Sequence, residues 1–436
     1  MNVKNINSEK GQAIVYLVIG LVVFLGFVAL AIDGGMALAD RRHVQNAADA
    51  ASLAGGAEAA IDLSKAKITD NIWSCGNVGF AMNNGEYAAV QRAQANNFTI
   101  IDKYPAPCDQ NCVIATCNNA GKYIDIKVDI SATTPSNFLQ LIFPNALHNE
   151  VEAVTRVFPG GPLAYGNAIV ALNPIDCNGA QKIGAGFRGD STTVVTGGGI
   201  FSNGCLTGGG SGNVNVTGGQ ISYNDFFGKD IFTPDAVSVY PKQIPPDAYN
   251  VPEPDVVSGE CSDPDANNIS ATDLMNLNKG PVTLDPGLYC ITGNKSLTIN
   301  SSAKAPFIGH GVTFYIVENI AVTINGGADL DITAPINDPD SDFYAPAPPP
   351  AIQGVLIYMP QSNNSPLTIN GGSNFTFTGG ILAPSSHVKI NGGSYNIALN
   401  SQVIGWDVEL VGSATIDVTY KGEEEGSLPT SMELHR

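Results

Sequence analysis

Hydrophobic and polar residues follow a different pattern in each part of this chain. Residues 13–32 are apolar and hold no charge and no proline. As a helix rising about 1.5 Å per residue they would span about 30 Å, the hydrocarbon thickness of a bilayer. Residues 33–158 show helical spacing and then alternation, and from residue 163 short β-branched runs end in Gly-Gly or Asn-Gly. The pattern predicts a transmembrane helix, an α+β module and a mainly β region.

A cleaved signal peptide is the alternative to a retained membrane helix. Its apolar region would be about 7–15 residues long and would end at a small-residue site. Here the run leads through Asp33 into further helical spacing. Lys4 and Lys10 precede the run and Arg41 and Arg42 follow it, so the positive-inside rule is nearly balanced. The acidic body and its cysteines favour a single pass through the cytoplasmic membrane, with the N-terminus inside and the bulk extracytoplasmic, at the cell surface.

The segment after the apolar run is expected to form a helix with one face of mostly small residues. These residues recur at steps of three and four, the spacing of one helix face: Val44, Ala47, Ala48, Ala51, Ala54 and Gly55. Small side chains let another backbone approach closely. The face should therefore dock either on the protein's own body, at residues 123–132, or on a partner subunit.

A longer motif includes this face. A Gly-Gln pair precedes the apolar run, and an Arg-x-x-x-Gln-x-Ala-Ala-Asp-Ala-Ala-x-Leu-Ala-Gly pattern follows it. The residues that form the motif are Gly11, Gln12, Arg41, Gln45, Ala47, Ala48, Asp49, Ala50, Ala51, Leu53, Ala54 and Gly55. The motif resembles the N-terminal region of TadG-like (TadE/TadG-like) proteins of the Tad, or Flp-type, pilus-assembly system. The resemblance implies a membrane-bound component whose partners are other pilus-assembly or pilin-like subunits.

A second stretch extends this resemblance to about residue 158. Residues 123–132 alternate between apolar and polar side chains, which predicts a half-buried strand. Residues 133–144 predict a short helix with Ser136 as its cap, and residues 150–157 predict another strand. TadE/TadG-like modules have this order of strand, short apolar helix and strand after their N-terminal helix.

The remainder of the chain contains near copies of one short sequence. Copies or weaker variants of Val/Leu-Thr-Ile-Asn-Gly-Gly begin at Leu297, Val322, Leu367, Val388 and Val408, at steps of 25, 45, 21 and 20 residues. Such a period with glycine turns is typical of a β-solenoid, here a right-handed β-helix-like one. The turn asparagines could stack in a ladder. A β-sandwich or jelly roll is the alternative architecture.

These patterns divide the chain into segments. We expect a cytoplasmic tail at 1–12, a transmembrane helix at 13–32, a TadE/TadG-like α+β module at 33–158, a first repetitive β region at 159–240, a Pro-rich segment at 241–257, a β-solenoid region at 258–422 with a Pro-rich insertion at 335–351, and a polar tail at 423–436. The Pro-rich segment should be a stiff surface connection that divides the repeats in two. The polar tail is expected to fray.

Charge and cysteine content narrow the function classes. The formal net charge is -19, and such a surface repels phosphate backbones, so nucleic acid is not an expected partner. The even number of cysteines in an exported chain favours disulfides, although four bridges would allow 105 pairings. The candidates are Cys75, Cys108, Cys112, Cys117, Cys177, Cys205, Cys261 and Cys290.

Two short motifs are candidates for a cofactor site or a metal site. Residues 184–189 match Gly-x-Gly-x-x-Gly, but β-type sequence follows them where a dinucleotide site needs a helix. Asp338, Asp340 and Asp342 offer carboxylates at alternate positions, a weak calcium candidate that lacks the glycine and terminal glutamate of an EF-hand. We therefore expect no cofactor and no metal.

One motif raises the possibility of polysaccharide chemistry. His310, between two glycines, resembles a short motif of β-helical polygalacturonases, whose chemistry needs clustered carboxylates. Asp329 and Asp331 lie two residues apart, and no basic partner for them is evident in the sequence. The expectation is a non-catalytic component of a pilus-assembly or cell-surface adhesion apparatus. The alternatives are a surface adhesin or glycan-binding β-helix protein, and a β-helical polysaccharide-degrading enzyme.

Overall fold

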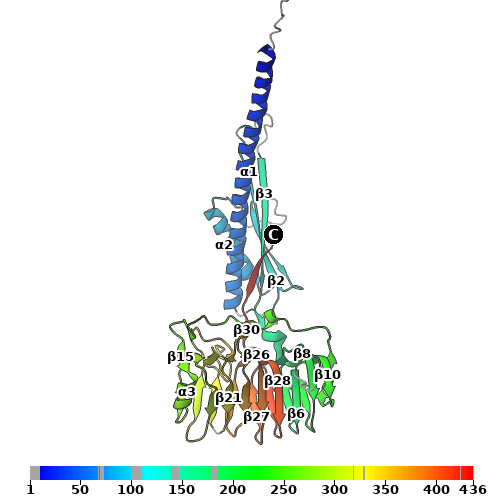
Figure 1. Ribbon diagram of the computed structural model, residues 1–436, viewed down its shortest axis with the longest axis vertical. Coiled ribbons are helices and arrows are strands. Elements are labelled where there is room, and N and C mark those ends of the chain that lie inside the picture. Colours follow the sequence, from blue (N-terminus) through cyan, green and yellow to red (C-terminus); the bar gives the residue numbers. More distant parts are fainter. Residues whose placement is uncertain are drawn as a thin grey trace, which may run out of the picture. The chain divides into compact units, whose positions relative to one another are not determined.

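The computed structural model shows a mainly β protein with a long N-terminal apolar helix. It describes residues 10–66, 68, 73–100, 110–136, 138, 147–178, 184–317, 319–327, 329–422 and 424–435. The chain forms two compact units (Figure 1). The first unit comprises Met1–Gly160 and Pro429–Arg436, and the second comprises Gly161–Leu428.

Helix α1 (Lys10–Lys65) begins the first unit and contains both the predicted transmembrane segment and the small-residue segment. Among the described residues it is the one helix long and apolar enough to cross a membrane, and no residue of its most apolar window is buried. The sequence of α1 has no proline, so its backbone hydrogen bonds can continue through Gly34 and Gly35 without a break. One continuous helix therefore links the apolar run to the folded body.

The rest of the first unit is a second helix and an antiparallel sheet. The elements are α2 (Gly79–Ala95), β1 (Cys112–Asn118), β2 (Tyr123–Thr134), β3 (Leu147–Phe158) and β31 (Ser431–His435), with sheet order β1-β2-β3-β31. The alternation predicted for residues 123–132 is confirmed, because Ile124, Ile126, Val128 and Ile130 are fully buried. The strand predicted at 150–157 lies within β3.

Two expectations for this unit need correction. Thr133 and Thr134, predicted to start a short helix, belong to strand β2; most of the remaining residues of that helix lie outside the described ones. The tail predicted to fray instead forms β31, which pairs with β3 from Val154 to Phe158. Leu434 packs against the core of the unit, so backbone pairing and apolar contact together order this polar sequence.

The second unit consists mainly of parallel strands. A nine-stranded sheet has, in spatial order, β11 (Phe232–Thr233), β9 (Val214–Thr217), β7 (Thr193–Thr196), β29 (Ile416–Thr419), β27 (Ile397–Asn400), β25 (Phe375–Thr378), β22 (Leu330–Thr333), β19 (Phe307–His310) and β16 (Val282–Leu284). Every pair of neighbours in it is parallel.

A 14-stranded sheet completes the wall of this unit. Its main path is β12 (Val237–Ser238), β10 (Ile221–Gly228), β8 (Gly199–Gly208), β5 (Asn167–Ala171), β28 (Val403–Gly412), β26 (Gly380–Asn391), β23 (Val355–Tyr358), β20 (Val312–Ile316), β17 (Gly287–Thr292) and β15 (Asn267–Ser270). Alongside it pair β6 (Gly184–Gly189), β18 (Leu297–Asn300), β21 (Val322–Asn325) and β24 (Leu367–Asn370). Long strands such as β26 pair first with β23 and then with β24, which turns the sheet round a corner.

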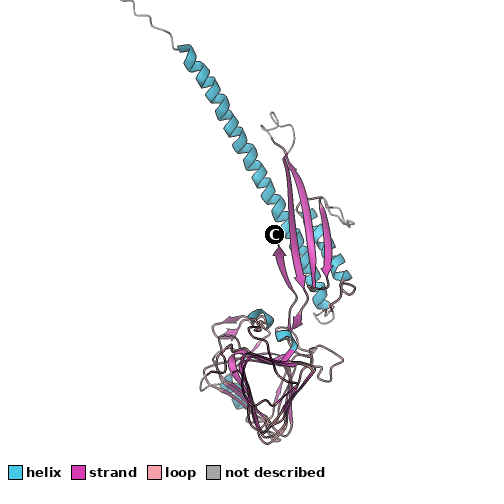
Figure 2. Ribbon diagram, turned by 90° about the vertical axis from the view of Figure 1, so that its right-hand side faces the viewer, coloured by secondary structure: helices cyan, strands magenta, loops and turns pink. Residues whose placement is uncertain are grey.

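Short elements close the unit. They are β4 (Gly161–Pro162) paired with β30 (Ser427–Leu428), β13 (Val256–Val257) paired with β14 (Glu260–Cys261), α3 (Ala271–Leu277) and the 3-10 turns Leu163–Gly166 and Pro246–Ala248. Viewed end on, the strands outline a three-sided tube (Figure 2). Its interior is one apolar cluster that includes Phe187, Phe307, Phe314 and Phe377.

Parallel pairing decides between the two architectures predicted for the repeats. The copies at Leu297, Val322, Leu367, Val388 and Val408 stack on one another in register. The sheets of a β-sandwich are antiparallel, whereas these strands all run the same way. The fold is therefore consistent with a β-helix-like unit, and the sandwich alternative is not supported.

The order of strands in the stack differs from their order in the chain. Strand β28, near the end of the unit, pairs with both β5 and β6 from its beginning, and β29 pairs with β7. In Figure 1 the red strands of the last repeats lie directly beside the green strands of the first ones. The two repetitive regions thus share both sheets. The prediction that the Pro-rich segment divides the repeats in two is therefore wrong for their arrangement in the fold.

The Pro-rich segment is a connection that packs on the wall of the unit. Ile244, Ala248 and Val251 are buried in an apolar cluster with wall residues such as Tyr358. The hydroxyl of Tyr358 donates a hydrogen bond to the backbone oxygen of Val251 at 2.8 Å. Proline-rich sequence suits this role because it holds an extended backbone without requiring strand partners.

Candidate functional site

The small-residue face of α1 packs inside the first unit. At Gly55 an added Cβ would lie 2.6 Å from the backbone oxygen of Gly85 on α2 and 2.8 Å from Ile126 Cγ2 on β2. At Gly56 it would lie 2.3 Å from Thr155 Cγ2 on β3. Helix α1 thus approaches α2 and the sheet more closely than any larger side chain permits. Of the two docking modes left open by the sequence, the described residues show the intramolecular one.

The remaining motif residues divide between buried and solvent-facing positions. Val44, Ala47, Ala48 and Ala51 are buried in the core of the unit. Ala50, Leu53 and Ala54 are half-buried, and Arg41 is exposed. Gly11 and Gln12 belong to α1, but their side chains lie outside the described residues.

The polar residues of the motif stabilise the helix and join it to the sheet. Gln45 Nε2 donates to Asp49 Oδ1 at 2.8 Å, one turn along α1. Ser52, between the small residues, donates to the backbone oxygen of Asp49 and accepts a hydrogen bond from the Thr155 hydroxyl at 3.1 Å. Ser52 and Thr155 are both fully buried. Their pairing satisfies polar groups that would otherwise be costly at a dry helix–sheet contact.

Two carboxylates at the end of the apolar run bind the end of strand β2. The backbone N–H of Phe138 donates to Asp33 Oδ2 at 2.9 Å, and Thr134 donates its hydroxyl proton to Asp40. Asp33 is only 2% exposed. Thr134, the last residue of β2, and Phe138, four residues beyond it, therefore satisfy acidic groups that the sequence places just after the apolar run.

The predicted asparagine ladder is present in the second unit. The side-chain amides form a chain in which Asn325 donates to Asn300 at 2.7 Å, Asn370 to Asn325 at 2.7 Å and Asn391 to Asn370 at 3.2 Å. The Oδ1 atom of Asn278, next to α3, accepts from the backbone N–H of Asn300 and extends the ladder by one layer. Stacked amides satisfy one another without a partner from another molecule, so the ladder is a stabilising feature of the turns.

Disulfides link three pairs of the predicted cysteines. They are Cys75–Cys117 in the first unit, and Cys177–Cys205 and Cys261–Cys290 in the second. Cys112 is also disulfide-bonded, and Cys108 lies outside the described residues.

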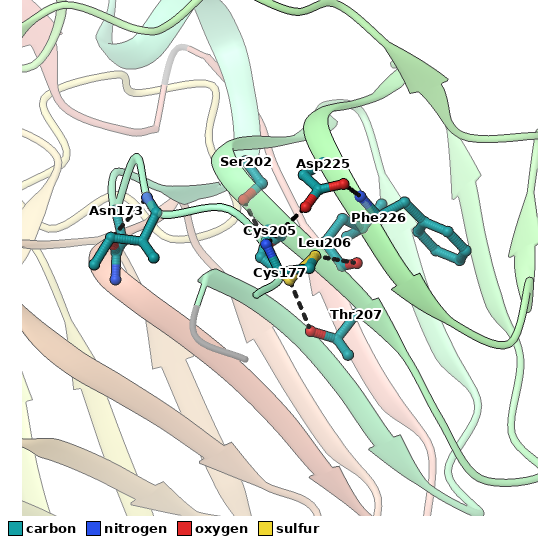
Figure 3. Close-up of a disulfide and its surroundings, with 9 residues drawn as sticks. Asn173, Cys177, Ser202, Cys205, Leu206, Thr207, Asp225 and Phe226 are labelled. Carbon is teal, nitrogen blue, oxygen red and sulfur yellow. Dashed lines mark hydrogen bonds between the residues drawn. A yellow bond between two sulfur atoms is a disulfide. The ribbon is translucent and has the colours of Figure 1, made fainter. Parts of the chain in front are cut away.

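The Cys177–Cys205 bridge ties the loop before β6 to strand β8 (Figure 3). Around it, the backbone N–H of Cys177 donates to Asp225 Oδ2 at 2.7 Å, and the Ser202 hydroxyl donates to the backbone oxygen of Cys205 at 2.8 Å. The bridge therefore fixes the connection between β5 and β6, which belongs to the layer that joins the two repetitive regions.

A charged cluster that the sequence reading missed lies on the outer side of β6, β26 and β28. It consists of Arg188, His387, Lys389, Asp407 and Glu409. Glu409 contacts Arg188 at 3.3 Å, Lys389 at 3.6 Å and His387 at 3.8 Å. Strand register brings them together: Lys389 pairs with Glu409, which pairs with Gly186, two residues before Arg188. No spacing within one segment could reveal this cluster, because its members come from opposite ends of the unit.

The two carboxyl groups of the charged cluster have different environments. Burial raises the pKa of Asp407, opposed by the hydrogen bond that Asn173 Nδ2 donates to it at 2.9 Å. The contact with His387, followed by the charges of Lys389 and Arg188, lowers the pKa of Glu409 below its usual value. The sequence did not predict two neighbouring carboxyl groups with opposite pKa shifts beside basic side chains.

The other candidate motifs do not form a site in the described structure. Residues Gly184–Gly189 form strand β6, and another strand follows them. Asp338 Oδ1 accepts the backbone N–H of Asp340 within a turn. No group of three or more His, Cys, Asp or Glu side chains that could hold a metal ion occurs among the described residues.

The expectation that Asp329 and Asp331 lack a basic partner is wrong for Asp331. His310 Nε2 lies 2.9 Å from Asp331 Oδ2, so Asp331 does have a basic neighbour. Both side chains are about half exposed. The pair joins adjacent strands β19 and β22, which are not consecutive in the sequence.

Comparison with known proteins gives one result. No curated protein and no solved structure matches the chain significantly. The family model Tad, described as putative Flp pilus-assembly TadE/G-like, matches residues 11–58. These residues lie within α1 and include the whole motif from Gly11 to Gly55. The resemblance to TadG-like pilus-assembly proteins is therefore confirmed, and helix α1 is the part of the chain that carries it.

Proposed function

We propose that this protein is a membrane-anchored, non-catalytic accessory or minor component of a Tad-type, or Flp-type, pilus assembly. The observation that carries the proposal is the family match at residues 11–58 on a helix whose most apolar window has no buried residue. A surface of that kind is unstable in water and stable in a bilayer. The role in pilus assembly comes from the family, and the anchoring comes from the physics of the helix.

The same proposal sets the topology. Disulfides persist in oxidising compartments and are rare in the cytoplasm, and both units contain them. These disulfides support a body that lies outside the cytoplasmic membrane, with the N-terminus inside. Protease added to spheroplasts should digest the body and leave a small N-terminal fragment; a fully protected body would contradict this orientation.

The packing of the motif changes which surfaces are proposed for partner contacts. Its small residues are occupied within the first unit, so they build the module that stands on the membrane. Contacts with other pilus-assembly or pilin-like subunits are assigned to the apolar half of α1 and to outward-facing residues. The second unit, as a β-solenoid, would act as a spacer or a binding surface.

Gene deletion tests the function directly. Cells that lack the protein should show fewer or altered pili by electron microscopy, and the full-length gene should restore them. A variant with the second unit removed separates the two roles, since assembly should depend on the first unit. Normal pili in the deletion strain would contradict the proposed role.

A surface glycan-binding role is the second candidate, favoured by the charged cluster on β6, β26 and β28. Its exposed Arg188 and Lys389 could contact acidic saccharides. Replacing both by alanine should then reduce cell binding to glycans while pili remain normal. Polysaccharide degradation is the third candidate. Because the proposed function is non-catalytic, His310→Ala is expected to leave every surface phenotype unchanged.

A further inference from the structure

The exposed apolar surface of α1 continues past the predicted end of the membrane segment. Ile32 is 42% exposed and Leu38, six residues further, is 63% exposed. Residues 14–38 of a helix extend for about 37 Å, more than the roughly 30 Å of the hydrocarbon core. Leu38 therefore falls at the boundary of a membrane that α1 crosses, rather than in bulk water.

Two carboxylates in this stretch of α1, which would be unfavourable next to lipid, are both hydrogen-bonded within the protein. Asp33 accepts the backbone N–H of Phe138 at 2.9 Å and is almost fully buried. Asp40 accepts the Thr134 hydroxyl. One donor, Thr134, is the last residue of β2 and the other, Phe138, lies four residues beyond it, so neither carboxylate would have to meet lipid without a hydrogen-bond partner.

The side chains left exposed at this level suit a membrane boundary. Phe138, whose N–H holds Asp33, is itself 44% exposed. Arg41 and Arg42 are exposed one turn beyond Leu38. Aromatic and apolar side chains at the acyl boundary, followed by basic ones at headgroup depth, are the order that lipid bilayers favour.

We propose that Leu38 and Phe138 form a second membrane contact beside the apolar run of α1, at the boundary between acyl chains and headgroups. The occupant is lipid rather than protein, because exposed apolar side chains of the same helix lead from Ile32 through Met36 to Leu38, and Phe138 is hydrogen-bonded to Asp33, the residue that directly follows the apolar run. The contact would add a fixed point away from the helix axis and so limit rotation of the first unit about α1. This inference rests on the anchoring proposed above.

Tryptophan fluorescence in nanodiscs tests the contact. Full-length protein carrying Phe138→Trp would be placed in discs of lipids brominated on their acyl chains, which quench nearby tryptophan. Unsubstituted protein supplies the background of Trp73 and Trp406. Phe27→Trp, on the exposed apolar run, is the positive control. Tyr87→Trp, on the exposed side of α2, is the negative control.

The expected result is quenching of the Phe138→Trp emission comparable to that of Phe27→Trp and clearly above that of Tyr87→Trp. If Phe27→Trp is quenched and Phe138→Trp behaves like Tyr87→Trp, α1 is anchored but the second contact is wrong. If Phe27→Trp is not quenched either, the anchoring itself fails. Leu38→Trp gives an independent reading of the same surface without altering β2, and its protection from quenching would also overturn the proposal.

Discussion

The two units bury their cores by different means. In the first unit, α1 lies so close to α2 and the sheet that Gly55 and Gly56 leave no room for a Cβ. In the second unit, identical or similar residues stack in register, as along Leu297, Val322, Leu367 and Val388. The first core depends on the absence of side chains where α1 packs on α2 and the sheet, and the interior of the second on repetition of the same side chain. The second unit also has glycines without room for a Cβ, such as Gly210 and Gly212, but these lie in the turns of its wall. Among core positions, single enlarging substitutions should therefore be most damaging at the helix contacts of the first unit.

The largest effect is expected from Gly55→Leu. Its side chain would collide with the backbone of Gly85 and with Ile126, and overpacking of this kind costs about 3 kcal/mol. Calorimetry of the purified full-length protein should show loss or a strong downward shift of one transition, with the transition of the second unit unchanged. Gly79→Leu, at a position with nothing within 4 Å, is the matched control. Equal melting temperatures for the two variants would contradict the idea that the first core depends on the absence of a side chain at Gly55.

A pH-dependent effect is expected in the second unit from Glu425. Burial raises its pKa well above the usual value, so the folded state binds this proton more tightly than the unfolded state. The stabilisation is complete below the unfolded pKa and is lost as pH rises through the folded pKa. The melting temperature of the second unit should therefore fall from pH 5 to pH 8, and Glu425→Gln should flatten that fall.

Glu424 provides a neighbour for comparison with Glu425. Its Oε1 atom contacts Lys421 Nζ at 3.0 Å and accepts from the Ser341 hydroxyl at 2.7 Å. The charge of Glu424 also raises the pKa of Glu425, but less than burial does, so Glu424→Gln should change the pH dependence much less than Glu425→Gln. If Glu425→Gln and Glu424→Gln alter the pH profile equally, burial of Glu425 is not its cause.

A smaller effect is expected from the asparagine ladder. Asn370→Ala removes the hydrogen bonds to Asn325 and from Asn391, and each net contribution is about 1 kcal/mol. Asn300→Ala, at the other end of the ladder, removes only the hydrogen bond from Asn325 and should cost about half as much. Chemical denaturation of the second unit would rank the two variants, and identical midpoints would indicate that the ladder adds no stability.

The smallest effect on the first unit should come from removing the second one entirely. Strands β4 and β30 pair, so Gly161 and Leu428 lie side by side. A short Gly-Ser linker in place of residues 161–428 should leave the sheet β1-β2-β3-β31 intact, with its transition within a few degrees of the original. Failure of this variant to fold would show that the units are not independent.

The sequence predicted those features that depend on local pattern. The alternation at residues 123–132, the motif of α1 and the recurring turn asparagines Asn300, Asn325, Asn370 and Asn391 can each be recognised within short segments of the sequence, and each prediction is confirmed. Helix α2 was not predicted, although Ala81, Gly85, Ala89 and Ala93 recur every four residues and are all buried. Its small side chains give little hydrophobic contrast, so the spacing was the only available signal.

Features that depend on non-local pairing could not be predicted. The order in which β28 and β29 stack on β5, β6 and β7 is set by strand register and interior packing, which no linear repeat records. The charged cluster at Glu409 follows from that order, and the contact of Asp331 with His310 follows from the pairing of β19 with β22. The docking of the small-residue face was left open for a similar reason, because the sequence of a face does not specify its partner.

The pairing of β31 with β3 has a consequence for the order of events during synthesis. Strand β31 follows the second unit in the chain, whereas β3 precedes it. The sheet of the first unit thus keeps an open edge until the entire second unit has been synthesised. Any chain interrupted in between would present β3 as an unprotected edge, so completion of this sheet depends on residues that follow the whole second unit.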